Sequence, residues 1–325
     1  MLQADPIRYS IILPIYNEEA VIPVLMLRLE QLLASLDAPA EVIFVNDGST
    51  DTSAIFLAGM CKLRPNHRLI NFSRNFGHQI AITAGLDAAQ GEAIIVMDAD
   101  LQDPPELVLE MIARWKEGYE IIHARRISRE GETWFKRASA NLFYLGLSRL
   151  AKVEIPRNVG DFRLIDRKVL EAFRAMPERD RFVRGMFAWL GFRTTYVDFH
   201  RAARVAGETK YPFVKMVRLA LTGIIGFSDV PLRLAIWAGI GVSGLAFMYG
   251  LYAIAEWFTT KGIASGWSST VVIISFLCGM NMLMTGIVGL YIGRIYNEVK
   301  RRPLYIVDRK VGFDAANSDQ TRHVA

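Results

Sequence analysis

The sequence has few cysteines and lacks two glycine motifs that often bind phosphate. Only Cys61 and Cys278 occur in 325 residues, which excludes a disulfide scaffold and most structural zinc sites. No GxGxxG follows the first apolar segment, and no GxxxxGK(S/T) occurs anywhere. These absences argue against a dinucleotide-dependent oxidoreductase and a P-loop enzyme. Any phosphate that this chain binds therefore needs another counter-charge.

Long stretches near the carboxyl end lack charge. Residues 234–255 and 262–293 contain no Asp, Glu, Lys or Arg, which explains a mean hydropathy of +0.22 beside a normal charged fraction of 22%. About 20 apolar residues suffice for a helix to cross a bilayer, so we predict spans at 232–258 and 267–293. Trp257 and Trp267 flank their link like an interfacial aromatic belt. The alternative, two buried helices of a large core, is disfavoured because such uncharged runs are rare in soluble helices.

Charge around these spans predicts their orientation. Basic residues precede the first span and follow the second, whereas only Lys261 lies between them. The positive-inside rule then places both termini in the cytoplasm, in a two-span protein of the cell (inner) membrane. Residues 1–10 have no long apolar run, so we expect neither signal peptide nor N-terminal anchor. We expect an α/β domain over 1–210, an amphipathic interfacial helix over 211–231, two membrane helices over 232–293 and a partly disordered cytoplasmic tail over 294–325.

The first 125 residues alternate apolar strands with helices. Strands are expected at 9–15, 41–46, 68–72, 93–97 and 120–124, and helices at 19–36 and 79–89. Continuous apolar strands between amphipathic helices favour a mostly parallel, Rossmann-like sheet covered on both faces. Ligands of such sheets bind beyond the carboxyl ends of the strands, and the polar residues of this domain gather there.

Asp98 and Asp100 follow the most apolar of these strands. Two neighbouring carboxylates suit Mg²⁺ or Mn²⁺, because the ion would keep coordination positions for the oxygens of a substrate diphosphate. The alternative is that they cap a helix or begin a turn. The run Asp103-Pro104-Pro105-Glu106 is a good helix start, so part of this acidity is structural.

Several motifs together resemble family 2 glycosyltransferases with a GT-A fold. Four lie in the first third of the chain: ILPIYNEE at 12–19, VNDGSTD at 45–51, SRNFGHQ at 73–79 and MDADLQDPPE at 97–106. Three more, GDFRL at 160–164, FVRGMFAWLG at 182–191 and GETKYP at 207–212, resemble the polyprenyl-phosphate branch. That branch includes dolichol-phosphate mannose synthases and GtrB-like bactoprenol glucosyltransferases, and two terminal spans match the latter best. The QxxRW motif of the processive branch is missing.

The resemblance implies a role for each matching position. The nucleotide would contact Pro14, Tyr16, Glu18 and Asp47. Asp98 and Asp100 would hold the metal and the donor diphosphate, with Gln102 beside the metal. Asp161 falls on the position usually proposed as catalytic. The acceptor phosphate or the donor diphosphate would meet Arg125, Arg126, Arg163, Arg201 and Lys210, of which Arg126, Arg163 and Lys210 join Asp161 in the catalytic set. For these basic residues the alternative is a solvated face or a lipid contact. His78 and His123 lack metal-ligand spacing, so we expect both to be structural.

The implied reaction is an inverting, metal-dependent transfer of a sugar from a nucleotide donor to undecaprenyl (polyprenyl) phosphate. UDP-glucose is the favoured donor; GDP-mannose with a dolichyl or polyprenyl acceptor and a UDP-linked modified arabinose are alternatives. A phosphate monoester has its second pKa near 6, so it needs no strong base, and we expect Asp161 to orient rather than to abstract a proton. A non-catalytic, membrane-tethered nucleotide-sugar-binding protein is a further alternative. We expect a homo-oligomer, with a tetramer as one form, and no nucleic-acid partner.

Overall fold

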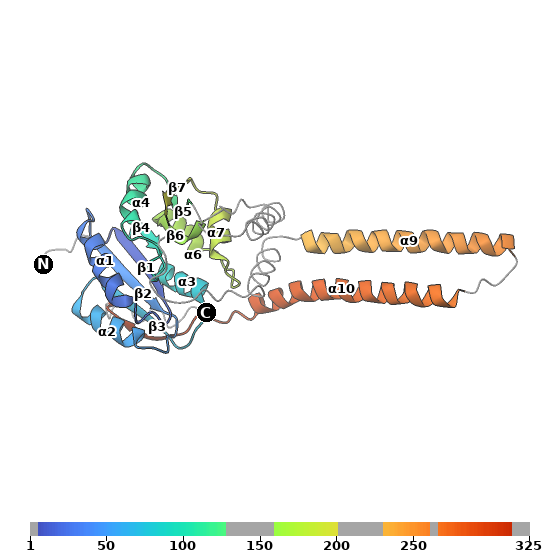
Figure 1. Ribbon diagram of the computed structural model, residues 1–325, viewed down its shortest axis with the longest axis horizontal. Coiled ribbons are helices and arrows are strands. Elements are labelled where there is room, and N and C mark those ends of the chain that lie inside the picture. Colours follow the sequence, from blue (N-terminus) through green and yellow to red (C-terminus); the bar gives the residue numbers. More distant parts are fainter. Residues whose placement is uncertain (1–5, 128–158, 201–229, 261–265, 314–325) are drawn as a thin grey trace.

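The computed structural model describes residues 6–127, 159–200, 230–260 and 266–313. They form an α/β domain and a pair of long helices that extend from it (Figure 1). The strands are β1 (Tyr9–Ile15), β2 (Ala40–Asn46), β3 (His67–Phe72), β4 (Ala93–Val96), β5 (Ile121–Arg126), β6 (Val159–Asp166), β7 (Thr194–Phe199) and β8 (Val307–Val311). The helices are α1 (Ile22–Ala34), α2 (Ser53–Leu63), α3 (His78–Ala88), α4 (Leu107–Lys116), α6 (Arg167–Arg174), α7 (Val183–Trp189), α9 (Val230–Thr260) and α10 (Trp267–Val299).

The described strands form one eight-stranded sheet in the order β7-β5-β6-β4-β1-β2-β3-β8. Neighbours β4, β1, β2 and β3 are parallel, as are β5 and β7. In contrast, β6 runs antiparallel to both β4 and β5, and β8 runs antiparallel to β3. The sheet is therefore mixed but mostly parallel, as the sequence predicted, because among the described strands β6 and β8 alone run opposite to the others. The expected strands lie within one or two residues of the observed ones.

Apolar side chains cover both faces of this sheet, as predicted. Leu13 and Phe44 pack with Leu25 and Leu29 of α1 in one buried cluster. Residues one position along in the strands, such as Ile12 and Ile43, point to the opposite face and pack with Ile82 of α3. Because strand side chains alternate between faces, a continuously apolar strand such as β1 serves both clusters.

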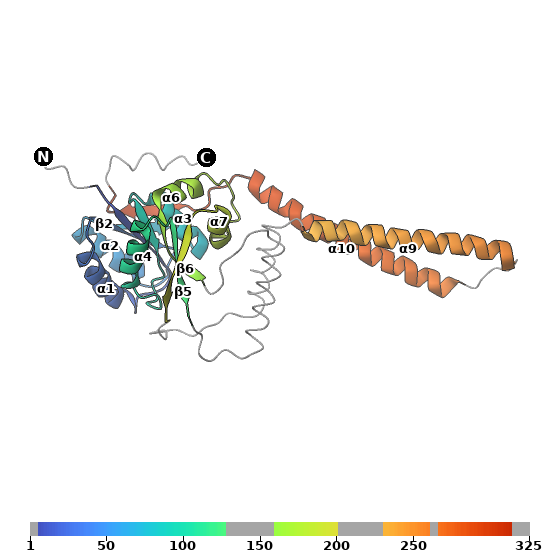
Figure 2. The same cartoon turned by 90° about the horizontal axis from the view of Figure 1, so that it is seen from above.

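Helices α9 and α10 run alongside each other away from the sheet (Figures 1 and 2). Stretches of each, Leu232–Tyr252 and Val272–Val299, are long and apolar enough to cross a membrane, and neither is buried inside the protein. Their exposed apolar side chains need another apolar environment. The interior of a membrane would provide one.

The segment after α10 returns to the α/β domain. Residues 307–311 form β8 on the outer edge of β3, and the Tyr305 ring stacks on Phe72 with centroids 5.0 Å apart. The described part of the expected tail thus completes the sheet, and α10 continues to Val299, past the predicted end of the span at residue 293. Most of the predicted interfacial helix (211–229) and residues 314–325 lie outside the described residues.

Candidate active site

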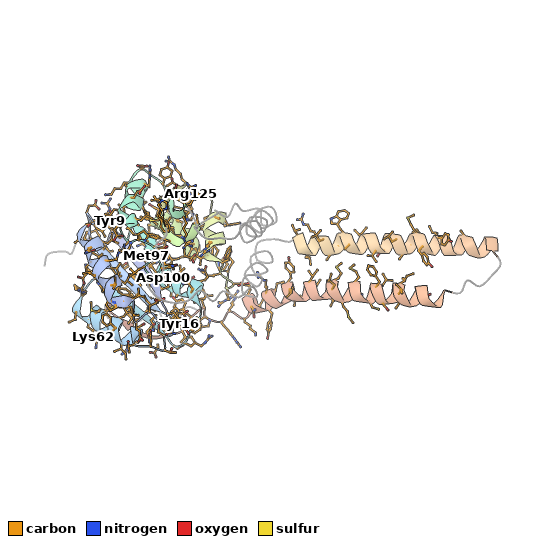
Figure 3. All side chains as sticks on the ribbon, in the orientation of Figure 1. Tyr9, Tyr16, Lys62, Met97, Asp100 and Arg125 are labelled. Carbon is orange, nitrogen blue, oxygen red and sulfur yellow. The ribbon has the colours of Figure 1, made fainter. Side chains whose placement is uncertain are left out.

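A cavity of about 560 Å³ lies beyond the carboxyl ends of β1, β2 and β4. Its lining residues are Pro14, Ile15, Tyr16, Glu18, Asp47, Asn75, Gly77, His78, Ala81, Asp98, Ala99, Asp100, Asp161 and Arg184. The structure thus brings together every predicted nucleotide-side residue, both acidic residues of the predicted metal site and Asp161. Figure 3 shows Tyr9, at the start of β1, on the side away from α9 and α10, and Tyr16 on the nearer side.

The antiparallel direction of β6 brings Asp161 to this cavity. Val96, the last residue of β4, pairs with Arg163 of β6. Asp161 therefore precedes that pair on β6 while Asp98 follows it on β4, so both carboxylates lie at the same edge. A parallel β6 would carry residue 161 toward the opposite edge. The sequence motifs predicted both residues for the site, but only the strand direction explains their proximity.

Asp161 is 3% exposed and is the centre of a hydrogen-bond network. Arg184 of α7 donates from Nε to Oδ1 and from Nη2 to Oδ2, both at 2.9 Å. His78 Nε2 lies 3.2 Å from Oδ2, and Gln79 Nε2 donates to the same oxygen at 3.3 Å. The carboxylate is thus held in one orientation by side chains from two helices.

These partners decide the charge of Asp161. Burial alone would raise its pKa, but the hydrogen bonds from His78 and Arg184 and the nearby charges hold the pKa well below its usual range. The pKa of Asp98 is raised, mainly by burial and also by the negative charges of Asp161 and Asp100. The positive charges of His78 and Arg184 lower this pKa but do not cancel the effect of burial. The low pKa keeps Asp161 ionised at neutral pH, whereas Asp98 would be ionised more readily with a cation beside it.

Arg163 lies behind Asp161. Its guanidinium, 1% exposed, donates to the carbonyl oxygens of Gly160 and Asp161 and to Asp161 Oδ1. It also lies over the Phe187 ring, 4.9 Å from its centroid, and burial lowers its pKa to about 10. A fully buried cation with these partners cannot contact a phosphate in this conformation. The predicted phosphate role of Arg163 is corrected to support of Asp161.

The acidic residues after β4 suit a divalent cation. Among the described residues, Asp98 Oδ1 and Gln102 Oε1 are buried oxygens without a hydrogen bond, and His78 Nε2 lies 3.5 Å from Asp98 Oδ1. No three His, Cys, Asp or Glu side chains converge into a complete metal cluster within the described ranges. Hard oxygen donors with an incomplete protein shell suit Mg²⁺ or Mn²⁺, which take further ligands from substrate phosphates. Gln102 itself does not line the cavity.

The loops after β1 and β2 are fastened together beside the cavity. Asn17 donates its backbone N–H to Ser49 Oγ at 2.9 Å and accepts from the Thr50 N–H at 2.8 Å. Asp47 accepts from the N–H groups of Phe76 and Gly77 at 2.7 and 3.0 Å, and burial raises its pKa against those bonds. Asp47 therefore orders the loop before α3 as well as lining the cavity.

The remaining predicted phosphate ligands lie elsewhere or outside the described residues. Arg125 forms a bidentate pair with Asp198 at 2.6 and 2.8 Å, and Figure 3 shows it well apart from Asp100 and Tyr16. Because its guanidinium is already engaged and remote from the cavity, the prediction for Arg125 is not supported. Arg126 Nη2 lies 3.8 Å from the buried Asp103. Arg201 and Lys210 lie outside the described residues.

Three cavity or network residues were missed from sequence: His78, Gln79 and Arg184. His78 was expected to be structural because metal-ligand spacing was the criterion, yet it contacts both Asp98 and Asp161. All three belong to motifs already noted, at 73–79 and 182–191. Membership of a motif was the available signal, but the motif could not say which of its members meet Asp161.

The sequence of this chain is similar to the sequences of known proteins. Residues 10–174 match the family model "Glycosyl transferase family 2". The chain is 48% identical over 98% of its length to YkcC, an uncharacterized glycosyltransferase of Bacillus subtilis (strain 168), covering 99% of that protein. It is 38% identical over 93% of its length to a prophage bactoprenol glucosyl transferase homolog of Escherichia coli (strain K12), covering 99% of it. A prophage-derived bactoprenol glucosyl transferase of Shigella flexneri matches at 38% over 93% of this chain and 98% of its own. The resemblance inferred from the motifs is confirmed: this chain belongs to glycosyl transferase family 2 and has the GT-A fold of a glycosyltransferase.

Proposed function

We propose that this chain transfers a sugar, glucose from UDP-glucose being the favoured case, from a nucleotide donor to polyprenyl phosphate at the cytoplasmic membrane face, with inversion. One observation carries the proposal: the same cavity is lined by an acidic pair, Asp98 and Asp100, and by Asp161, a carboxylate held by Arg184. The first suits a metal-bound diphosphate, and the second suits a fixed contact with a sugar. Likeness to proteins named bactoprenol glucosyl transferases over nearly the whole chain supports the acceptor class.

The donor would lie along the cavity from β1 to β4. Pro14, Tyr16 and Glu18 would meet the nucleoside, as the resemblance implied, and the loop held by Asp47 would close this end. Asp98 and Asp100 would hold Mg²⁺ or Mn²⁺, which when bound would counter the negative charge that develops on the leaving diphosphate. The raised pKa of Asp98 supports this placement, because a nearby cation would favour its ionised form.

Asp161 would orient the sugar rather than act as a base. Its pKa is held well below the usual range, and Arg184 occupies both of its oxygens. A group so poor at binding protons is a weak general base. The acceptor does not need one, since a phosphate monoester is mostly dianionic at neutral pH. Its attacking oxygen can approach the anomeric carbon with the nucleoside diphosphate leaving on the opposite side.

The apolar helices would keep the enzyme with its lipid substrate. An isoprenoid tail stays in the bilayer, so an enzyme anchored by α9 and α10 meets the acceptor at high local concentration. The carboxyl edge of the sheet lies on the side nearer these helices (Figure 3), which supports delivery of the lipid phosphate there. Arg126, Arg201 and Lys210 remain the predicted phosphate ligands, and an oligomer remains a prediction.

A donor panel tests this function. Membranes containing the protein are incubated with undecaprenyl phosphate, Mn²⁺ or Mg²⁺, and radiolabelled UDP-glucose, UDP-N-acetylglucosamine, a UDP-linked modified arabinose or GDP-mannose. We expect label in the lipid extract with UDP-glucose and none without the lipid phosphate. Label from a different donor would correct the sugar while leaving the reaction class intact.

Two variants and a binding measurement separate loss of catalysis from loss of binding. The variant Asp100→Ala should lose transfer, whereas Glu110→Gln, an exposed change on α4, should retain it. Folded wild-type protein that binds UDP-sugars but labels no lipid with any donor would overturn the enzyme proposal in favour of a membrane-tethered binding protein.

A further inference from the structure

The carboxyl end of α10 is fastened to the loop that precedes α7. Glu298, one residue before the end of the helix, accepts with Oε1 from the backbone N–H groups of Arg179 and Asp180 at 2.9 and 3.3 Å. One turn earlier, Arg294 forms an ion pair with Asp180 at 3.2 Å. Both views place this end of α10 next to the α/β domain (Figures 1 and 2).

Glu298 is a poor choice for the helix itself. The last turn of a helix carries a partial negative charge, so a carboxylate there is disfavoured. The two backbone N–H groups of the loop offset this cost, since a carboxylate accepts unusually strong hydrogen bonds. Glu298 is unfavourable for its own helix but makes contacts with another element, which indicates that its role lies outside the helix.

The loop at residues 177–182 is tied to the domain by its own contacts. Arg181 donates to the carbonyl oxygens of Glu178 and Met176 at 3.0 and 2.9 Å, and its guanidinium lies 5.0 Å from the centre of the Phe173 ring. These contacts hold the loop against the end of α6. The next element along the chain is α7, which begins at Val183.

The first two residues of α7 belong to the network around Asp161. Val183 donates its N–H to Gln79 Oε1 at 3.1 Å, and the same Gln79 side chain donates to Asp161 Oδ2. Arg184 supplies the bidentate pair with Asp161. Three residues thus separate Asp180, held by α10, from Arg184, which holds the Asp161 carboxylate.

We propose that Glu298 is a positioning residue for sugar transfer: by fastening loop 177–182 to the end of membrane helix α10, it sets the position of Arg184 and hence of Asp161. The anchor is then also part of the active-site framework, and the position of α10 is coupled to the orientation of Asp161. The inference rests on the proposed function for its activity readout but predicts a structural change that can be measured without it.

Three variants test the coupling. Glu298→Ala removes the acceptor for both N–H groups, and Glu298→Gln keeps an oxygen there. Tyr305→Phe is the matched control, because it removes another anchor of the same segment, the hydrogen bond to Asp87 at 3.1 Å, and leaves both hydrogen bonds of Glu298 in place. We expect Glu298→Ala to lower kcat by roughly 10- to 100-fold with little change in KM for the donor, as for a small misplacement of catalytic groups. Glu298→Gln should recover most of the loss, and Tyr305→Phe should stay within about twofold of the wild type.

A double variant shows whether the effect passes through Arg184. If it does, adding Glu298→Ala to Arg184→Lys should lower kcat much less than it does in the wild type, because coupled changes are not additive. Fully additive losses would overturn the proposal, as would equal losses in Glu298→Ala and Tyr305→Phe.

Hydrogen exchange supplies the readout that does not depend on transfer. In Glu298→Ala the amides of residues 179–184 should exchange faster, while the amides of β1 and β2 should keep their protection. Unchanged exchange at 179–184 would overturn the inference even if the wild type is active. Faster exchange there with an inactive wild type would support the fastening and refute only the proposed reaction.

Discussion

Arg184 engages both carboxylate oxygens of Asp161, each at 2.9 Å, and Arg163 reaches the same carboxylate from behind at 3.3 Å. One nearly buried anion therefore balances two guanidinium groups at the edge of the cavity. The two arginines hold the Asp161 carboxylate in one orientation and stabilise its negative charge. Four predictions follow from this arrangement and its surroundings.

Asp161→Asn should impair both stability and transfer. The substitution leaves the buried Arg163 facing a neutral amide, and breaking a buried ion pair costs about 3–5 kcal/mol. We expect a lower Tm in detergent and a large loss of kcat. Because the Asp161 pKa is depressed, its stabilising contribution is present above the usual carboxyl range and is lost only in strong acid. The wild-type pH–rate profile should thus show no Asp161 ionisation between about pH 5 and 8.

The matched control for this variant is Asp198→Asn, whose carboxylate pairs with Arg125 at an exposed site. It should leave both Tm and kcat nearly unchanged, because exposed ion pairs contribute little. Nearly full kcat in Asp161→Asn would refute the orienting role.

Removing the metal ligands should abolish transfer without unfolding the protein. Asp98→Asn and Asp100→Asn each remove a hard anionic oxygen from the predicted cation site, and a chelator should have the same effect on the wild type. We expect losses of roughly 100-fold or more in kcat, comparable to removal of a key electrostatic group. Calorimetric titration of Mn²⁺ with UDP should show weaker binding in both variants, but not in Glu110→Gln. Undiminished transfer in the presence of chelator would exclude a metal-dependent reaction.

Two buried histidines should make the domain acid-sensitive. Burial lowers the pKa of His67 to about 4 and, with the charge of Arg163, that of His123 to about 3. Both stay neutral in the folded protein at pH 5, whereas unfolded chains bind protons below about pH 6.5. Stability is therefore lost as pH falls below 6.5, by roughly 2 kcal/mol per histidine at pH 5.

Thermal unfolding between pH 7 and 5 measures this effect. The decrease in Tm should be smaller in His67→Gln and in His123→Gln, whatever their Tm at pH 7, but unchanged in His200→Gln, whose side chain is exposed. Equal slopes in all four proteins would contradict the assignment.

Gly48 should tolerate no side chain. Its φ is +66°, and a Cβ there would lie 2.4 Å from the backbone carbon of Arg74. Gly48→Ala should cost more than about 1 kcal/mol and displace the loop that Asp47 holds, weakening UDP binding. Gly59→Ala is the control: nothing lies within 4 Å of its added Cβ in the interior of α2, so it should stabilise by about 0.5–1 kcal/mol. Equal Tm values for the two variants would refute the steric argument.

Local patterns were sufficient for much of the fold. Apolar runs located β1 to β5 because a strand buried on both faces needs apolar side chains at successive positions. Long uncharged segments located α9 and α10 for a similar reason. Strand direction was less accessible: nothing within residues 159–166 indicates that β6 runs antiparallel, because that depends on the path of the chain before it.

The candidate site shows the same division. Motifs pointed to Tyr16, Asp47, Asp98, Asp100 and Asp161, which the structure gathers around one cavity. Basic residues were predicted less well. Arginine serves equally in structural pairs and at phosphate sites, and sequence does not distinguish the buried Arg163 or the paired Arg125 from a phosphate ligand.

The sequence by itself determined the alternation of strands and helices, the apolar anchor and the residues whose chemistry suits a nucleotide sugar. Tertiary structure alone decided that β8 returns to the sheet after α10, that Arg184 rather than Arg163 faces the cavity beside Asp161, and that Glu298 fastens α10 to the loop before α7. The physical reason is the distance along the chain over which each interaction acts. Hydrophobic periodicity and turn chemistry act between neighbours in the chain, whereas the charge state and orientation of Asp161 depend on groups 2 to 83 positions away that only folding brings together.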